Sequence, residues 1–157
     1  MRLDYNTPNK VKIDMKSYCK EIINKYPYTL NKNVNCPWNI NLLDSKNNTK
    51  ELDQRDAETF HTFVMKCMFV AKRGRPDIST GISYLSTKVL KPYKEDMKKL
   101  TRIISYVKNS INICLTLEAD NSRKIKWYLE SSFGTHQNLR SHTGAIMTLG
   151  KGSIIVD

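Results

Sequence analysis

Two amphipathic helical patterns meet at the stretch Lys72-Arg73-Gly74-Arg75-Pro76-Asp77-Ile78-Ser79. Upstream, between Asp56 and Ala71, apolar residues recur at spacings of four, three and four, which is one stripe of an α-helix. Pro76 then restarts a helix, because the N–H that proline lacks would be unpaired at a helix start. Asp77 is favourable there, at the positive end of the helix dipole. The stretch therefore predicts a helix with Asp56 as candidate N-cap, a basic loop and a second helix.

Further elements are predicted on both sides of this joint. Residues 1–14 are expected to form a β-hairpin, and a short helix starts at Met15 and ends before Pro27. A third helix is predicted from Lys94 to Asn109. After Ser110 the hydrophobic period changes to two, which indicates strands. These strands are predicted over residues 111–117, 125–133, 144–149 and 153–156. The expected fold class is α+β, with a helical block followed by an antiparallel β-meander.

Charge is the strongest compositional signal. The 157 residues include 26 Lys and Arg against 15 Asp and Glu, a formal net charge of +11. Such a surplus attracts polyanions, and nucleic acid is the expected partner. A compositional bias toward Lys, Asn and Ile explains the charge equally well, so the arrangement of the charges has to decide.

Other classes of function find little support in the sequence. The chain has no apolar run near the length of roughly 20 residues that crosses a bilayer, and no signal peptide, so we expect a soluble intracellular protein without a membrane partner. Its four cysteines and three histidines lack metal-ligand spacing. No metal site and no cofactor are predicted within the chain.

The joint also suggests a family. Read with Phe60-His61 upstream and Tyr106-Val107-Lys108 downstream, Arg75-Pro76-Asp77-Ile78 resembles the polymerase region of copia-type retrotransposons. Arg140-Ser141-His142-Thr143-Gly144 is similar to a turn in the first hairpin of the adjoining ribonuclease H. The resemblance implies a truncated reverse transcriptase palm hairpin and helix over 1–27, an irregular connector over 28–55, thumb and connection helices over 56–110, and a connecting strand with truncated ribonuclease H-like strands over 111–157.

The same resemblance implies that the chain lacks its parent's catalytic sites. Both parent activities use clustered carboxylates around Mg²⁺. The sequence has no Asp-Asp pair for the polymerase site, and only Glu130 falls at a ribonuclease H carboxylate position, where the family pattern has aspartate. The other carboxylates would lie beyond Asp157. Glu130 is therefore a vestigial site position or simply a solvated carboxylate on an open sheet face.

Six basic residues are candidate contacts to an RNA/DNA duplex. A thumb helix resembles a rail along the template-primer duplex, and three of these residues recur four apart on the predicted third helix; the others lie in the joint. The alternative is a solvated helix face. Trp38, Trp127 and Tyr128 could stack on bases, but packing roles are expected for them. The six candidates are Lys72, Arg73, Arg75, Lys94, Lys98 and Arg102.

Three hypotheses follow. The first is a fragment or degenerate copy of a retrotransposon reverse transcriptase and ribonuclease H, catalytically inactive by itself and missing polyprotein segments at both ends. The second is a non-catalytic basic nucleic-acid-binding module derived from a retroelement. The third is a chain that has no function and does not fold stably, which a lack of hydrogen-exchange protection over residues 111–157 would reveal.

Overall fold

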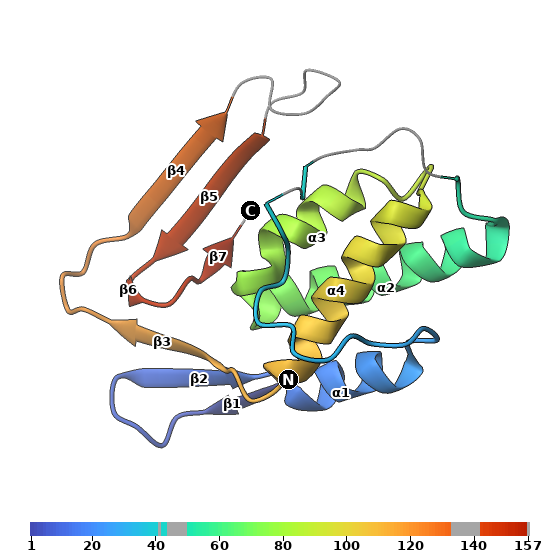
Figure 1. The fold of residues 1–157 in the computed structure, drawn as a ribbon. Helices are drawn as coiled ribbons and strands as arrows, with labels where there is room; N and C mark the ends of the chain where they lie inside the picture. The colour runs from blue at the N-terminus through green and yellow to red at the C-terminus, as the bar shows by residue number, and fades with distance from the viewer. Residues whose placement is uncertain (41, 44–49, 133–141, 157) are drawn as a thin grey trace.

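A computed structural model of the chain describes residues 1–40, 42–43, 50–132 and 142–156 (Figure 1). The elements that it contains are β1 (Arg2–Asp4), β2 (Lys10–Asp14), α1 (Lys16–Lys25), α2 (Gln54–Arg73), the 3₁₀ turn η1 (Pro76–Ile78), α3 (Ser79–Ser86), α4 (Lys94–Asn109), β3 (Leu115–Ala119), β4 (Lys126–Ser132), β5 (His142–Thr148), β6 (Gly150–Lys151) and β7 (Ile155–Val156).

The predicted helices are confirmed with small changes at their ends. The third predicted helix is α4, with the predicted bounds, and α1 ends before Pro27. Helix α2 starts earlier than expected because Asp53, rather than Asp56, is its N-cap: the Asp53 carboxylate accepts a hydrogen bond of 2.9 Å from the Asp56 backbone N–H. Pro76 opens a 3₁₀ turn that continues directly into α3.

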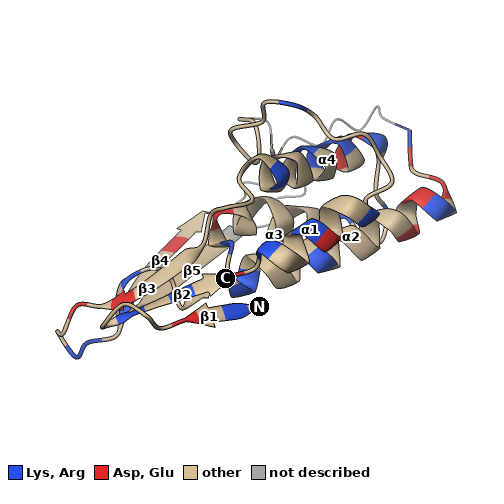
Figure 2. Ribbon diagram, turned by 90° about the horizontal axis from the view of Figure 1, so that it is seen from below, with Lys and Arg blue, Asp and Glu red and all other residues tan. Residues whose placement is uncertain are grey.

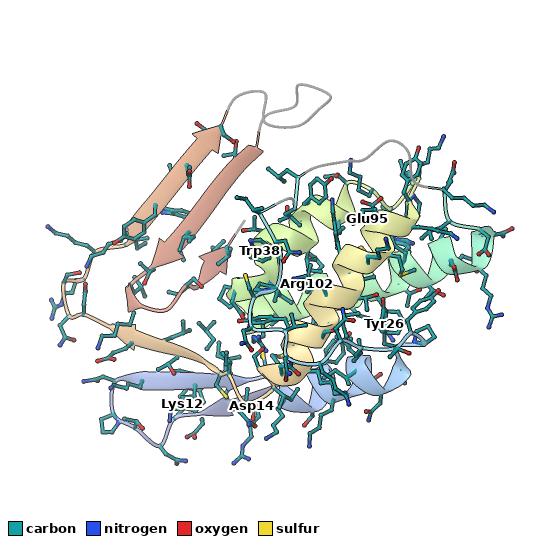
Figure 3. The ribbon with its side chains drawn as sticks, in the orientation of Figure 1. Lys12, Asp14, Tyr26, Trp38, Glu95 and Arg102 are labelled. Carbon is teal, nitrogen blue, oxygen red and sulfur yellow. The ribbon has the colours of Figure 1, made fainter. Side chains whose placement is uncertain are left out.

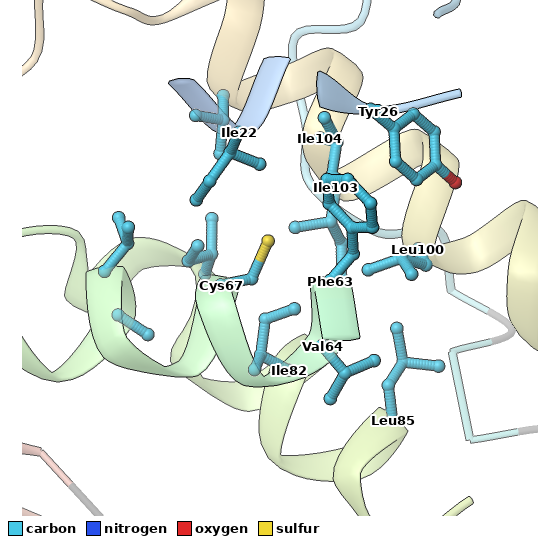
Figure 4. Packing of buried hydrophobic residues seen from close by; sticks show 14 of the residues in the cluster. Ile22, Tyr26, Phe63, Val64, Cys67, Ile82, Leu85, Leu100, Ile103 and Ile104 are labelled. Carbon is cyan, nitrogen blue, oxygen red and sulfur yellow. The ribbon is translucent and has the colours of Figure 1, made fainter. Parts of the chain in front are cut away.

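The four helices enclose the hydrophobic core. Fully buried side chains from α2, α3 and α4 interdigitate, among them Val64, Ile82 and Leu100 (Figure 4). Helix α1 is held against α4 by Tyr26, whose hydroxyl lies 2.7 Å from Thr101 Oγ1. All residues of this buried core cluster fall between Met15 and Val107, and in the described part of the chain none of them belongs to a strand.

Strand β3 differs from its prediction at its start. Residues Ile111 and Asn112 form a turn in which the Ile113 N–H donates to the Ser110 carbonyl, so the strand begins only at Leu115. Alternating apolar residues are compatible with such a turn as well as with a strand. Here the turn forms because these residues follow directly on the last turn of α4.

The strands form two sheets instead of one meander. β3 pairs antiparallel with β2, matching Val11 with Leu117 and Ile13 with Leu115, and the first sheet has the order β1-β2-β3-β6. β4, β5 and β7 form the second sheet, in that order. The N-terminal hairpin is therefore joined to a strand that follows the helices, and both sheets extend away from the helical block (Figure 1).

In the described residues no helix combines the length and the apolar character needed to cross a membrane.

Candidate nucleic-acid interface

Arg75 lies at the centre of the joint between α2 and α3. Its side chain is 1% exposed. The Nε and Nη2 groups donate to the Asp77 carboxylate at 2.9 and 2.8 Å, while Nη1 and Nη2 donate to the carbonyl and hydroxyl oxygens of Ser110 at 3.2 and 2.6 Å. The guanidinium also lies over the Tyr106 ring, 5.4 Å from its centroid. Arg75 thus fastens the joint to the C-terminal end of α4.

Tyr106 and Asp77 complete this clamp, which consists of Arg75, Asp77, Tyr106 and Ser110. The Tyr106 hydroxyl donates to Asp77 Oδ2 at 2.8 Å. Burial alone would raise the pKa of Asp77, but its hydrogen bonds with Arg75, the positive charge of Arg75 and the Tyr106 hydrogen bond together lower the pKa below the ordinary value of 3.8. The carboxylate is therefore ionised near neutral pH, as a partner for a buried guanidinium has to be.

The prediction that Arg75 contacts an RNA/DNA duplex is wrong. A side chain with 1% exposure, and with its donors directed at Asp77 and Ser110, cannot reach a phosphate. The Arg-Pro-Asp spacing, which places a carboxylate two residues from the guanidinium across a proline turn, was the sequence signal for an internal ion pair.

The three predicted residues on α4 differ from one another in exposure. Lys94 is exposed, and Lys98 is exposed but paired with Glu95, whose carboxylate lies 3.2 Å from its Nζ atom. Arg102 is half-buried, and its Nε atom is buried with no hydrogen-bond partner among the residues that the structure describes. Figure 3 shows Glu95 near the start of α4 and Arg102 further along the helix. The structure therefore does not present these residues as a uniform rail of exposed charges.

Lys72 and Arg73 are both exposed, and they lie next to each other at the C-terminal end of α2. Arg73 lies over the ring of Phe69, with 5.6 Å from the guanidinium carbon to the ring centroid, and Lys66 lies 5.3 Å from the centroid of Phe63. Phe69 is 45% exposed. Lys66, Phe69, Lys72 and Arg73 are together called the α2 basic end below.

Aromatic and apolar side chains surround the α2 basic end. Tyr18 of α1 contacts Phe69 with 5.2 Å between the ring centroids. Beside it, a groove of about 510 Å³ runs between α2 and β7, and its lining includes Phe69, Lys72, Arg73 and Ile155. Positive charges next to an accessible aromatic ring are the combination that binds the backbone and the bases of nucleic acids.

Sequence reasoning missed the aromatic part of this surface. Lys66, Phe69 and Arg73 are spaced by three and four residues, so they share one helix face, opposite to the buried stripe of α2. That spacing was the available signal. Tyr18, which belongs to another helix, could be added only from the three-dimensional structure.

The aromatic residues named from the sequence have different environments. Trp38 packs against the core beside α3, as predicted: a Cβ atom added to Gly81 would lie 2.9 Å from its ring. Trp127 and Tyr128 on β4 are instead 51% and 61% exposed, so the packing role expected for them is wrong. Tyr128 lines a groove that β4 shares with α3, which leaves most of its side chain exposed.

Glu130 lies on β4, exposed and opposite Gly144 of β5. It faces a groove of about 420 Å³ that also includes Ser79, Thr80 and Ser83 of α3. Among the described residues no group of three or more His, Cys, Asp or Glu side chains could hold a metal ion. The residues present around Glu130 therefore do not fit a two-magnesium site. Residues Arg140 and Ser141 of the predicted ribonuclease H turn lie outside the described part of the chain.

The candidate residues are divided between two surfaces. Figure 2 shows α4 on one side of the helical block and α1, α2 and α3 on the other, with Lys and Arg on both sides. The structure thus brings Lys72 and Arg73 together at the α2 basic end, and it keeps Lys94 and Lys98 on a separate helix.

Comparison with known proteins gives one informative similarity. The chain is 27% identical over 99 residues to a Saccharomyces cerevisiae protein assigned to transposon Ty5-1, which covers 63% of this chain and 32% of that protein. The chain therefore spans about a third of the length of the relative it matches. No family model and no solved structure matches. The similarity supports a retrotransposon-derived origin for this sequence.

Proposed function

We propose that this chain is a non-catalytic fragment of a copia-type retroelement polymerase and ribonuclease H region, and that it binds nucleic acid through the α2 basic end. The similarity to the transposon Ty5-1 protein supports the retroelement origin. The joint motif, with the palm, thumb and ribonuclease H correspondences described above, supports the finer assignment.

The observation that carries the binding proposal is the exposed cluster of Lys72, Arg73 and Phe69 on a rigid support. The Arg75 clamp fixes the end of α2 against α4, so the basic side chains project from an ordered scaffold instead of a loose loop. Neutralising phosphates with such side chains releases condensed counterions, which makes binding favourable and dependent on salt. The exposed Phe69 ring adds a stacking surface for an unpaired base.

The absence of catalysis is proposed on two grounds. The sequence contains no Asp-Asp pair for a polymerase metal site. Glu130 stands without the other carboxylates that a pair of magnesium ions requires, as far as the described residues show. We expect no primer extension and no cleavage of a hybrid by the purified chain.

Fluorescence anisotropy with a labelled RNA–DNA hybrid and a labelled single strand tests the binding proposal. The variant Lys72→Ala/Arg73→Ala should weaken binding by roughly tenfold, the order expected for two lost phosphate contacts. Lys32→Ala/Lys124→Ala is the matched control, because it also removes two exposed positive charges, from two loops elsewhere in the chain. Equal weakening in both variants would show that only net charge matters and would overturn the assigned surface.

Lys94→Ala/Lys98→Ala measures the contribution of α4 in the same assay. A larger loss than that of the α2 variant would move the interface to α4. Extension of a primed RNA template in the presence of Mg²⁺ would separately overturn the non-catalytic part of the proposal, whichever surface binds.

A further inference from the structure

Strand β4 is an open edge of the second sheet. Within the described residues it pairs only with β5, and the sheet order β4-β5-β7 leaves its other side without a partner strand. Figure 1 shows β4 as the outermost strand of its sheet, on the side of β5 opposite to β7. A strand of this kind presents unpaired backbone N–H and C=O groups that can pair with another strand.

The side chains of β4 do little to block such pairing. Trp127, Tyr128 and Leu129 follow one another in the strand and are 51%, 61% and 73% exposed. The strand contains no proline, which would remove a hydrogen-bond donor. Its only charged residues are Lys126 and Glu130, one of each sign, on either side of the apolar residues.

These two charges make the strand complementary to itself. In an antiparallel pair of β4 strands centred on Tyr128, Lys126 lies opposite the partner's Glu130, and the two-fold symmetry produces this ion pair twice. Trp127 then lies opposite the partner's Leu129, and the two Tyr128 side chains are neighbours. A register centred on Leu129 would instead place Lys126 opposite the partner's Ser132 and would form neither ion pair.

We propose that β4 is a self-association edge, through which two copies of this chain pair antiparallel about Tyr128 and join their second sheets into one continuous sheet. Lys126 is available for this contact although its ammonium group also touches Asp120, because its side chain is 39% exposed and an ammonium group has three donors. The α2 basic end lies on other elements, so nucleic-acid binding is not needed for the pairing.

The net charge of +11 on each copy opposes association. Long-range repulsion of this kind is screened at physiological salt, where the Debye length is about 8 Å, whereas the close contacts across paired strands are screened much less. The association should therefore be measured at physiological ionic strength.

Sedimentation velocity over a concentration series, combined with charge exchange, tests the proposal. The wild-type chain should show reversible dimerisation. Glu130→Lys places two lysines opposite each other at both contacts, and Lys126→Glu does the same with two glutamates. Each variant should dimerise at least about tenfold more weakly, because both cross-strand pairs turn from attractive to repulsive.

Mixing the two variants in equal amounts gives the decisive result. In a mixed dimer the two substituted side chains, which carry opposite charges, face each other at one contact, and the natural pair of Lys126 with Glu130 forms at the other. Dimerisation should therefore return to within about threefold of the wild type.

Two exposed positions elsewhere supply controls with the same charge changes, namely Glu58→Lys on α2 and Lys20→Glu on α1, and these variants should leave the dimer unchanged. A monomeric wild type, dimers that persist in both β4 variants, or a mixture that stays monomeric would each overturn the proposal.

Discussion

At the scale of single residues, the environment of Arg75 decides its role. A basic residue in a basic tract is expected to face solvent, yet Arg75 is 1% exposed and Arg73, two positions earlier, is exposed. The difference arises because the chain turns at Gly74 and Pro76 and directs the Arg75 side chain beneath the end of α4. The same side chain, arginine, is thus part of an internal clamp at position 75 and a surface charge at position 73.

Arg75→Ala should lower the free energy of unfolding by about 2–4 kcal/mol, because it leaves a partly buried carboxylate without its partner. Arg75→Lys should be intermediate, since an ammonium group cannot reproduce the bidentate geometry with Asp77. Urea denaturation monitored by circular dichroism measures both values. Arg73→Ala is the control, and a loss as large as that of Arg75→Ala would contradict the clamp.

The clamp also predicts how stability depends on pH. The folded state lowers the Asp77 pKa below 3.8, so the ionised carboxylate stabilises the fold above that value, and this contribution is lost as the pH falls through the lowered pKa. The difference in unfolding free energy between the wild type and Asp77→Asn should therefore be largest near neutral pH and shrink below about pH 4. A difference that stays constant from neutral to acidic pH would show that the Asp77 charge does not contribute.

At the scale of elements, the helices could be predicted well because each carries its own signals. The apolar stripe of α4 and the proline at the start of η1 lie within the segments that they define. Strand pairing could not be predicted in the same way, because β2 pairs with β3, and all four α-helices lie between these two strands in the sequence. Only the folded helices bring these two apolar strands together, so the sequence pattern around residues 111–157 is compatible with one meander or with two sheets.

The residues of the candidate site divide in the same way, into those that the sequence predicts and those that only the folded structure brings together. Lys72 and Arg73 could be named from the sequence because they are adjacent in the chain. The neighbourhood of Phe69 and Tyr18 depends on how α1 packs on α2. Arg102 is half-buried, although it lies on the same predicted stripe as the exposed Lys94 and Lys98. A stripe of charges at regular spacing therefore predicts a shared helix face, but it does not predict whether that face is open.

The packing of α3 gives a prediction for Gly81. A Cβ atom at this position would lie 2.9 Å from both Ile103 Cδ1 and the Trp38 ring. Gly81→Ala should have a small effect, because its higher helix propensity offsets part of the crowding, whereas Gly81→Val should destabilise the fold by about 1–3 kcal/mol through overpacking. Thermal denaturation of the two variants checks this order. Equal stability of Gly81→Val and the wild type would show that α3 does not pack as closely against Trp38 as described.

At the scale of the whole molecule, the helical block holds the core and the two sheets extend from it. The first sheet connects the N-terminal hairpin to β3, so the stability of β3 should depend on β2. Ile13→Asp places a charge on the apolar face of β2 and should lower the hydrogen-exchange protection of the β3 amides, Leu115–Ala119, while the amides of α4 keep theirs. Unchanged protection in β3 would contradict the observed pairing.

The central claim is that an ordered, clamped helical block presents the α2 basic end to nucleic acid. The most direct test is the slope of log affinity against log salt concentration for an RNA–DNA hybrid, in the wild type and in Lys72→Ala/Arg73→Ala. Each phosphate contact contributes about one to this slope, so the double variant should lower its magnitude by about two, whereas Lys32→Ala/Lys124→Ala should leave it unchanged. Identical slopes for the wild type and the Lys72→Ala/Arg73→Ala variant would show that these residues do not contact phosphates and would contradict the claim.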